Sequence, residues 1–452
     1  MFELSDSQVF IHDMQKAGFA QEVTLCGGIL IPEKVSDERL RAAANKVLEA
    51  NDALRSYFIE KDGKVYQAYD PYEERIFELR RFESTEDMEA WAKLYATIPL
   101  DYRIEGEGKD KGMGLGSVLE GVEKLGPRLA FNFLKLQRAA ARRKKELGLE
   151  GGEPSCFELI LVQLPDASGA LIKMHHIISD GWSMVLVGNQ FLHALKGEPF
   201  KAYDYRDYVE RDKAYKQSER AQFDREFFRD EWLKHPKPTV CFPGEFYSFE
   251  GNKTSLALGT ELSKKIQAYC SENRVSGMNV FLSAVGIWAS RKLCEDSFYL
   301  GTLSINRAGT EEKNTVGLFV STLPILMDIT PDISFKQLVL DTREKAFSVL
   351  RHARGYANAA ETYGNVFDLY VSYRNDTLEA DVSAQINEYF SGVFADFAVL
   401  TIAENSNRGE FTMNLDHNCK VTEDEAMDLL RNVASIISKG IEDDSLLVDD
   451  IR

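Results

Sequence analysis

The chain has 452 residues, of which 44% are hydrophobic, 11% aromatic and 28% charged. This length exceeds one ordinary core and favours two domains, and the composition excludes disordered and fibrous classes. The 54 Lys and Arg residues against 72 Asp and Glu leave a net charge of −18, the wrong sign for following a phosphate backbone. We therefore expect no nucleic-acid partner.

Neither a membrane span nor a metal site is indicated by the sequence. No apolar run approaches the roughly 18–20 residues that a membrane helix needs, and the N-terminus MFELSDSQVF lacks the pattern of a signal peptide. Six cysteines are scattered singly, at positions 26, 156, 241, 270, 294 and 419, without a CxxC pair. This spacing predicts reduced thiols, no zinc site and a cytoplasmic location.

Helical and strand patterns alternate through the first half of the chain. Ser36 is a predicted N-cap for a helix that ends near Ala50. A hairpin is expected over 56–67, around the turn residues 61–63. A second hairpin is expected over 156–176, turning at 166–169, and a helix follows Gly181.

The second half repeats this mixture after a polar, aromatic connection over 196–237 with short helices. We expect helices near 262–274, 279–294, 335–352 and 422–439, and strands near 297–305, 317–327, 366–373, 390–403 and 409–416. The pattern predicts a mixed α/β protein with two subdomains, 1–200 and 201–452.

One heptapeptide, 175–181, carries most of the functional information. It reads HHIISDG, of the form HHxxxDG, and lies where a strand ends and a helix begins. With seven histidines in the chain, a chance match is expected about once in two thousand such sequences. A histidine at such a turn can reach a substrate from a fixed backbone, which favours a catalytic site. The alternatives are an exposed loop and a half-built metal site, and no third ligand lies at recognisable spacing.

The segment HHIISDGWSM resembles the signature of the condensation domains of nonribosomal peptide synthetases, in the chloramphenicol-acetyltransferase-like superfamily. Other segments resemble further motifs of that family, in the family's order. They are LSDSQ at 4–8, NDALRSYF at 51–58, YRDY at 205–208, NR at 306–307, VGLFVSTLP at 316–324 and, weakly, VSYRN at 371–375.

Three features depart from the family pattern. Ser321 stands where the family usually has Asn, and only His352 remains of the HQxxPFE motif. In addition, about 40–50 residues are inserted between Asp101 and Phe157, over about 104–153, which is longer than an ordinary loop.

The resemblance implies two acetyltransferase-like subdomains that form a V-shaped pseudo-dimer with a tunnel at their interface. It implies amide formation between an acyl thioester donor, on coenzyme A or an acyl carrier, and the amine of an aminoacyl thioester on a peptidyl carrier protein. No cofactor would be bound, because the phosphopantetheine arms of the carriers, or coenzyme A, only present the substrates. An adenylation domain is the expected downstream partner.

The resemblance also suggests a role for each residue around the motif. His176 is the expected catalytic residue, which orients the amine and transfers a proton, and the Gly181 N–H is a candidate oxyanion donor. His175 is expected to be structural, and Asp180 to form a buried ion pair with Arg307 that shapes the site. Trp182, Ser183 and Ser321 are candidates for the substrate tunnel.

The insertion contains a basic segment with an apolar stripe at helical spacing. The stripe is formed by Leu129, Phe133, Leu136 and Ala140, and seven Arg and Lys residues lie between 128 and 145. One interpretation is a helix that packs its apolar face on the body and leaves a solvated basic face. The other is a docking surface for an acidic acyl carrier or for the phosphates of coenzyme A.

Two alternatives to the condensation reaction stay open. One is a stand-alone acyltransferase that uses acyl-CoA and a free alcohol or amine, and the other is a non-catalytic domain that recruits partners. If the protein is a condensation domain, we expect it to be a starter condensation domain, because LSDSQ follows Met1 almost immediately. The final residues SLLVDDIR resemble a linker into an adenylation domain, and an excised internal domain is the alternative.

Overall fold

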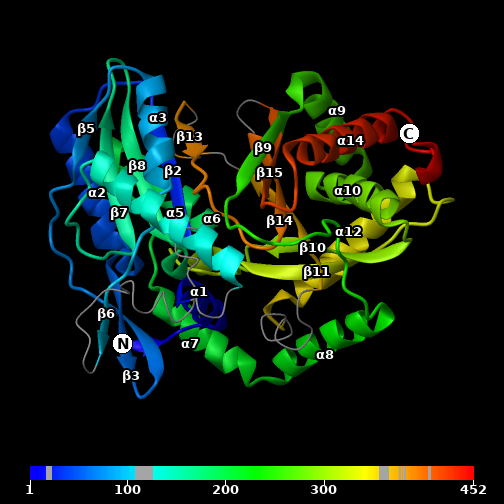
Figure 1. The fold of residues 1–452 in the computed structure, drawn as a ribbon, viewed down its shortest axis with the longest axis horizontal. Coiled ribbons are helices and arrows are strands. Elements are labelled where there is room, and N and C mark those ends of the chain that lie inside the picture. Colours follow the sequence, from blue (N-terminus) through cyan, green and yellow to red (C-terminus); the bar gives the residue numbers. More distant parts are fainter. Residues whose placement is uncertain are drawn as a thin grey trace. The chain divides into compact units, whose positions relative to one another are not determined.

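A computed structural model of the chain describes residues 1–16, 23–106, 126–355, 366–375, 378, 380, 383–405 and 409–451. These residues form two compact units of mixed α/β structure (Figure 1). Unit 1 consists of Met1–Ala214, Arg307–Phe319 and Thr377–Val393. Unit 2 consists of Tyr215–Asn306, Val320–Asp376 and Phe394–Arg452.

A five-stranded sheet forms the centre of unit 1, in the order β13-β2-β8-β7-β5. Its strands are β2 (Thr24–Ile31), β5 (Leu79–Arg81), β7 (Phe157–Gln163), β8 (Ser168–His175) and β13 (Gln385–Glu388). All pairs are antiparallel except β5 with β7. The expected second hairpin is thus formed by β7 and β8, and β8 is buried along its whole length.

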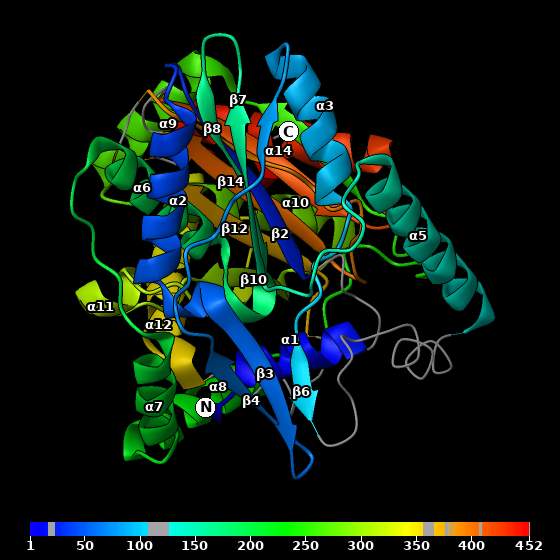
Figure 2. The same cartoon turned by 90° about the vertical axis from the view of Figure 1, so that its left-hand side faces the viewer.

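Helices cover both faces of this sheet (Figure 2). On one face, α3 (Thr85–Ala96) packs on Cys26, Leu171 and their neighbours. On the other face lie α2 (Asp37–Ala50) and α6 (Gly181–Lys196). Helix α6 contacts β2 closely because Gly27 of β2 and Gly188 of α6 have no side chain between them. Ser36 caps α2 as expected, because its side chain accepts the Arg39 N–H at 3.3 Å.

A smaller four-stranded sheet in the order β1-β4-β3-β6 completes unit 1. Its strands are β1 (Phe2–Glu3), β3 (Ser56–Lys61), β4 (Lys64–Tyr69) and β6 (Ile104–Gly106). The β3–β4 hairpin is the expected one, and its turn residues Asp62 and Gly63 both have positive φ, of 53° and 71°. The remaining helices of the unit are α1 (Asp6–Lys16), α5 (Pro127–Glu146), α7 (Tyr205–Lys216) and the short α11 (Gly309–Lys313).

Unit 2 is built on a six-stranded mixed sheet in the order β11-β10-β12-β14-β15-β9. The strands are β9 (Asn252–Ala257), β10 (Ser297–Ser304), β11 (Ser321–Asp328), β12 (Leu369–Asn375), β14 (Ala398–Asn405) and β15 (Glu410–His417). The helices are α8 (Glu219–Lys234), α9 (Gly259–Asn273), α10 (Gly277–Leu293), α12 (Phe335–Arg351) and α14 (Glu423–Glu442).

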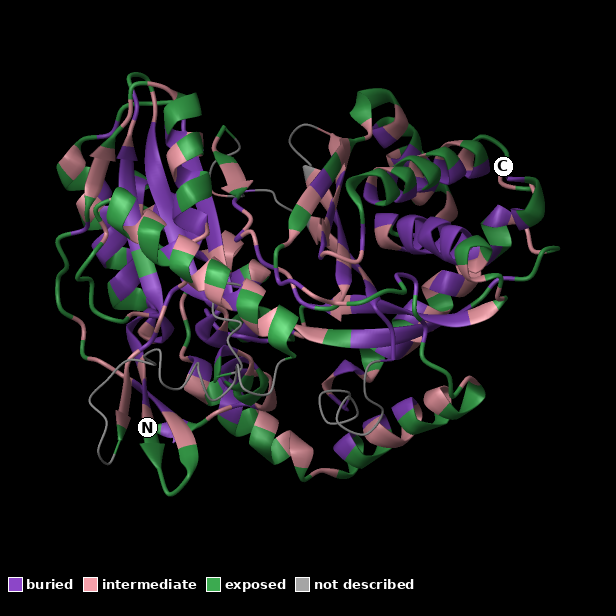
Figure 3. Cartoon of the chain, viewed as in Figure 1, coloured by how far each residue is buried: buried purple, intermediate pink, exposed green. Residues whose placement is uncertain are grey.

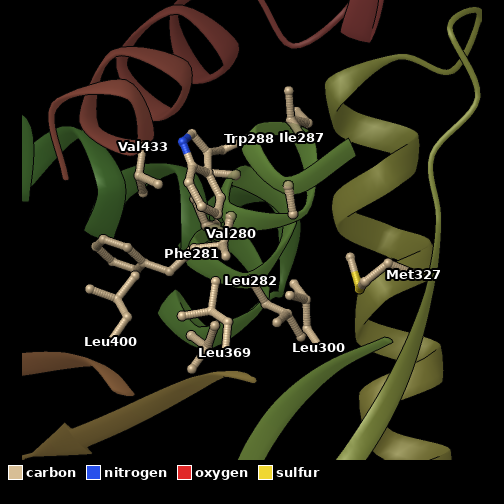
Figure 4. Close-up of a cluster of buried hydrophobic side chains, with 14 of the residues drawn as sticks. Val280, Phe281, Leu282, Ile287, Trp288, Leu300, Met327, Leu369, Leu400 and Val433 are labelled. Carbon is tan, nitrogen blue, oxygen red and sulfur yellow. The ribbon is translucent and has the colours of Figure 1, made fainter. Parts of the chain in front are cut away.

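Helix α10 forms the centre of the core of unit 2. Phe281 and Leu282 are fully buried, and they lie with Leu300 and Leu400 of the sheet in the cluster drawn in Figure 4. Figure 3 shows α10 coloured as buried along most of its length. An apolar helix of this kind needs cover on all sides, which α9, α12, α14 and the sheet supply.

The units found differ from the expected division into 1–200 and 201–452. Unit 1 continues to Ala214 and takes in two later segments. One of them supplies β13, which pairs with β2, and the other contains Arg307, which bonds to α6. These attachments are hydrogen bonds between residues more than 100 positions apart, so local patterns do not reveal them. Other differences are local: 390–397 is not a strand, and α1, α3 and β9 are additional elements.

Candidate active site

The HHxxxDG segment connects β8 with α6 in unit 1. His175 is the last residue of β8 and pairs with Thr24 of β2, and residues His176–Ile178 form a single 3₁₀ turn. The His176 N–H donates to the Val23 carbonyl at 2.7 Å. Asp180 is the N-cap of α6, which begins at Gly181. The backbone of both histidines is therefore held by the central sheet.

His175 is fully buried, and both of its ring nitrogens have a partner. Nδ1 accepts the Ile177 N–H at 3.0 Å, which leaves Nε2 to carry the proton and donate to Oε1 of Gln15. The Tyr102 ring meets the imidazole edge-on, with 4.9 Å between ring centroids and 82° between planes. Burial lowers the pKa of His175 to about 3, so the ring is neutral. This geometry fits a structural role.

Behind His175 lies a buried polar cluster that sequence reasoning missed. Gln15 Nε2 donates to Asp101 Oδ1 at 3.1 Å, and Nδ1 of His12 lies 2.5 Å from the Tyr102 hydroxyl. Burial lowers the pKa of His12 to about 4 and raises that of Asp101 to about 6. A signal was present in α1, where Gln8, His12 and Gln15 recur at helical spacing among buried positions.

His176 differs from its neighbour in having a free ring nitrogen. Its Nδ1 is buried and forms no hydrogen bond to any described residue, and the side chain as a whole is partly exposed. Burial lowers its pKa, while the nearby Asp180 carboxylate and the backbone of His176 and Ser179 act in the opposite direction. The ring is thus a neutral imidazole near pH 7, which can accept a proton.

The expected ion pair between Asp180 and Arg307 is present in unit 1. Nη2 of Arg307 lies 2.9 Å from Oδ1 and 3.0 Å from Oδ2 of Asp180, and both side chains are almost completely buried. Asp180 Oδ1 also accepts the Ser183 N–H at 2.8 Å, and Oδ2 accepts the Phe319 N–H at 3.0 Å. With these donors the Asp180 carboxylate has no room for a substrate proton.

Arg307 also bonds to the backbone around it. Nη1 donates to the carbonyls of Glu312 and Thr315, at 2.6 Å each, and the guanidinium lies over the Phe319 ring, 3.9 Å from its centroid. Gly317 packs against the ring of Tyr205, where a Cβ would approach a ring carbon to 2.0 Å. Segment 307–319 is therefore fastened to the HHxxxDG loop by charge, hydrogen bonds and close packing.

The structure corrects the expectation for Ser183 as a tunnel residue. Its side chain is fully buried, and its hydroxyl donates to Asp180 Oδ1 or the Gly317 carbonyl, each at 2.9 Å. The same oxygen accepts from Arg307 Nη2 at 2.9 Å and from the Gly317 N–H at 3.2 Å. A hydroxyl with this many partners inside the protein stabilises the loop and does not face a substrate.

The other candidates, Gly181, Trp182 and Ser321, are partly exposed or exposed as whole residues. Gly181, the first residue of α6, is partly exposed, and its N–H lacks an intrahelical partner because of its place in the first turn. Trp182 is 38% exposed, and its indole N–H donates to the Lys313 carbonyl at 2.9 Å. Ser321 begins β11 in unit 2, and its hydroxyl is buried without a hydrogen bond to any described residue.

Two further motifs meet the HHxxxDG loop inside unit 1. The Ser5 hydroxyl lies 3.2 Å from the Tyr205 hydroxyl, which donates to the Leu318 carbonyl at 2.6 Å. Gln8 Nε2 donates to the Ile177 carbonyl at 2.8 Å. Segments 4–8, 175–183, 205–208 and 316–319 thus form one connected site. His352 lies elsewhere, in unit 2, with Nδ1 2.6 Å from Asp224 Oδ1.

The described part of the chain contains no group of three or more His, Cys, Asp or Glu residues suited to a metal ion. In that same part, no helix is both long and apolar enough to cross a membrane. The chemistry available at the site is that of an imidazole, a helix N-terminus and a rigid loop.

A family model described as "Condensation domain" matches residues 135–439, about two thirds of the chain. The chain belongs to the condensation-domain family. Among curated proteins it is 22% identical, over 420 residues, to tyrocidine synthase 3 of Brevibacillus parabrevis. That alignment covers 90% of this chain and 6% of the synthase, so the chain spans only a small part of the length of this relative.

Solved condensation domains share the fold along the whole chain. The first condensation domain of the calcium-dependent antibiotic synthetase, in complex with a substrate analogue, has a TM-score of 0.77 at 16% identity, covering 99% of each chain. A variant of the starter condensation domain of rhizomide synthetase, in complex with C8-CoA, has a TM-score of 0.76 at 16% identity, covering 100% of this chain and 97% of the other. The expected fold class, a two-subdomain acetyltransferase-like α/β fold, is confirmed by these likenesses.

Proposed function

We propose that this condensation domain transfers an acyl group from a thioester donor to the amine of an aminoacyl thioester on a carrier protein, forming an amide. The observation that carries the proposal is the pair of unlike histidines in the HHxxxDG loop. His175 is fully buried with both ring nitrogens occupied, whereas His176 is partly exposed and its Nδ1 has no partner among the described residues. Family membership supplies the reaction class, since condensation domains form amides from carrier-bound substrates.

The energetics set what His176 has to do. An α-amine has a pKa near 7.7–8.0, so neutralising it at pH 7 costs only about 1 kcal/mol. The larger tasks are to place the amine against the thioester carbonyl and to remove a proton from the zwitterionic adduct. A neutral imidazole on a fixed backbone suits both tasks, so we assign them to His176.

The oxyanion of the tetrahedral adduct needs a donor that is in place before the reaction. The Gly181 N–H lies at the N-terminus of the 16-residue helix α6, where the helix dipole favours negative charge. We assign this N–H to the oxyanion. Asp180 and Arg307 hold the loop that carries both groups, and Trp182 and Ser321 stay proposals for contacts with the substrate.

The acyl donor is proposed to be an acyl-CoA or an acyl carrier, as for a starter condensation domain. The structural neighbour described as the starter condensation domain of rhizomide synthetase is in complex with C8-CoA. No cofactor is needed in this proposal, because coenzyme A and the phosphopantetheine arms act as substrate carriers. An adenylation domain is proposed as a partner of the acceptor carrier.

Intact-mass analysis of a loaded aminoacyl carrier tests the proposal. The protein is incubated with that carrier and a panel of acyl-CoA and peptidyl carrier donors, and the expected result is a mass gain of one acyl group from acyl-CoA. Transfer only from a peptidyl carrier would contradict the starter role and indicate an elongation domain. Turnover of free amines or alcohols, with no reaction on the carrier, would indicate a stand-alone acyltransferase. The absence of transfer to any acceptor would indicate a non-catalytic domain.

A further inference from the structure

Helix α5 presents a row of basic residues to solvent. Positions spaced three and four apart along it lie on one face, and every residue of one such row is exposed. The row, called the basic stripe below, consists of Arg128, Phe131, Lys135, Arg138, Arg142 and Lys145. Phe131 is its apolar member and is 68% exposed.

The opposite face of α5 is anchored to unit 1. Phe133 and Ala140 are buried, and the helix packs against α3, as Figure 2 shows. At its C-terminal end the Leu147 carbonyl accepts a hydrogen bond from Arg80 Nη2 at 3.1 Å. The basic stripe is thus held on a fixed helix whose apolar side is already occupied. Residues 107–125, the preceding part of the expected insertion, lie outside the described residues.

The charge of α5 is opposite to that of the rest of the protein. The helix has seven basic residues and one acidic residue, a net charge of +6, which leaves −24 on the remaining residues. Arg138, Arg142 and Lys145 form no ion pair with any described residue. Like charges three and four residues apart destabilise a helix by about 0.2–0.5 kcal/mol per pair. Within the described residues, no ion pair offsets this cost at Arg138, Arg142 and Lys145.

We propose that the basic stripe docks the acceptor carrier protein through an acidic helical surface of that carrier, with Phe131 as the apolar contact. The inference rests on the proposed function, in which the donor can arrive on coenzyme A but the amine always arrives on a carrier. The −24 on the other residues repels an acidic partner, so α5 attracts it at one place and in one orientation.

The stripe also lies on the unit that holds the catalytic loop. The positive charge of Lys144, which precedes Lys145 of the stripe in the sequence, acts to lower the pKa of Asp101. Asp101 accepts from Gln15, and Gln15 accepts from His175. A carrier on α5 would therefore dock at the edge of the polar cluster that supports the HHxxxDG loop.

The test is the triple variant Arg138→Glu/Arg142→Glu/Lys145→Glu, assayed with a fixed acyl-CoA donor and two acceptors. With the loaded carrier we expect the KM of the carrier to rise about tenfold at low salt, and the difference to shrink as salt screens the charges. With an aminoacyl cysteamine thioester, which has no protein surface, kcat and KM should equal those of the wild type. Phe131→Ala should also raise the KM for the carrier alone.

Matched controls separate docking from general charge and from folding. Arg229→Glu/Lys264→Glu/Lys265→Glu changes the same number of exposed charges in unit 2 and should leave the KM for the carrier within twofold. Binding of the carrier is measured independently by fluorescence anisotropy, so docking is tested even where turnover is absent.

Three results would overturn the docking proposal. The first is an unchanged KM and affinity for the carrier in the α5 variant, and the second is an increase in the KM for acyl-CoA instead. The third is a wild-type protein that sediments as a homodimer, with an α5 variant that sediments as a monomer. No turnover of either acceptor by the wild type, with carrier binding that depends on α5, would contradict the proposed function but not the docking surface.

Discussion

At the scale of single residues, two adjacent histidines have opposite environments. The β8 backbone alternates side chains between the two faces of the sheet up to His175, and the 3₁₀ turn then redirects His176. His175 bonds to Gln15 and Ile177, whereas His176 keeps a free Nδ1. His175 is therefore held inside unit 1, and His176 is the residue to which we assign the proposed proton transfer.

His176→Ala should abolish amide formation while thermal unfolding stays close to that of the wild type, because Nδ1 of its ring has no partner among the described residues. His175→Ala should unfold at lower temperature, because it loses two buried hydrogen bonds worth about 1 kcal/mol each. It should keep measurable turnover, because the proposed proton transfer is assigned to His176. The measurements are intact-mass turnover and calorimetry. Equal loss of turnover from both variants, with both folded, would mean that the catalytic role is shared or assigned to the wrong histidine.

Stability should fall in mild acid because His12 is buried in its neutral form. Its pKa of about 4 lies below the ordinary 6.5, so the unfolded chain binds the proton first and stability is lost as pH falls from 6.5 towards 4. The loss from His12 amounts to about 2 kcal/mol between pH 7 and pH 5. His175 acts in the same direction, and Asp101, whose pKa is raised to about 6, acts in the opposite one.

Urea unfolding of the wild type and of His12→Gln at pH 7 and pH 5 measures this contribution. The variant should have the shallower pH dependence, since its side chain does not titrate. Equal differences in unfolding free energy between the two pH values, in both proteins, would show that His12 does not titrate as its burial predicts.

At the scale of elements, the segment 307–319 and helix α6 stabilise one another. Their contact combines the buried ion pair of Arg307 with Asp180, the hydrogen bonds of Ser183 and the packing of Gly317 against Tyr205. The HHxxxDG loop thus depends on a segment that follows it by more than 120 residues. Substitutions in this contact should reduce activity through structure.

Asp180→Ala and Arg307→Ala should each lower the melting temperature by several degrees. Removing one partner of a buried pair leaves an uncompensated charge and costs roughly 3–5 kcal/mol. The double variant should cost less than the sum, because neither charge is then left alone. Calorimetry of all four proteins gives the coupling energy, and strict additivity would show that the pair does not contribute.

Gly317→Ala should destabilise the protein by roughly 1–3 kcal/mol, because its Cβ would lie 2.0 Å from a ring carbon of Tyr205. Gly152→Ala is the matched control, since nothing lies within 4 Å of a Cβ there. Urea unfolding of both variants is the measurement. A Gly317→Ala protein as stable as the control would mean that the ring of Tyr205 moves aside at little cost.

At the scale of the whole molecule, the six cysteines are all free thiols, as expected from their spacing. Three of them are buried, and burial raises the pKa of Cys26 to about 12 and that of Cys156 well above its usual value. Cys294 is exposed. The thiols therefore differ in reactivity by their depth in the two cores.

Alkylation at pH 8 should label Cys294 rapidly in the native protein, whereas Cys26 and Cys156 should react only after unfolding in guanidinium. A buried thiol reacts slowly because neither the reagent nor the charged thiolate is tolerated in the core. Peptide mass mapping after a short pulse identifies the labelled residues. Rapid native labelling of Cys26 would indicate local opening of the central sheet of unit 1.

The sequence by itself determined many of the local elements and the position of the HHxxxDG loop between a strand and a helix, because capping residues, hairpin turns and this motif act over a few residues. Ser36 and the turn at Asp62 and Gly63 could be identified in this way, whereas the pairing of Asp180 with Arg307 was implied by the resemblance to the family motifs. Tertiary structure alone decided which distant groups complete the site. Gln15, Asp101 and Tyr102 carry no motif, and the hydroxyl of Ser183 could have faced a substrate until its partners were placed around it. The physical reason is that burial, and the partner of each polar atom, depend on contacts between segments far apart in the chain, which no local pattern encodes.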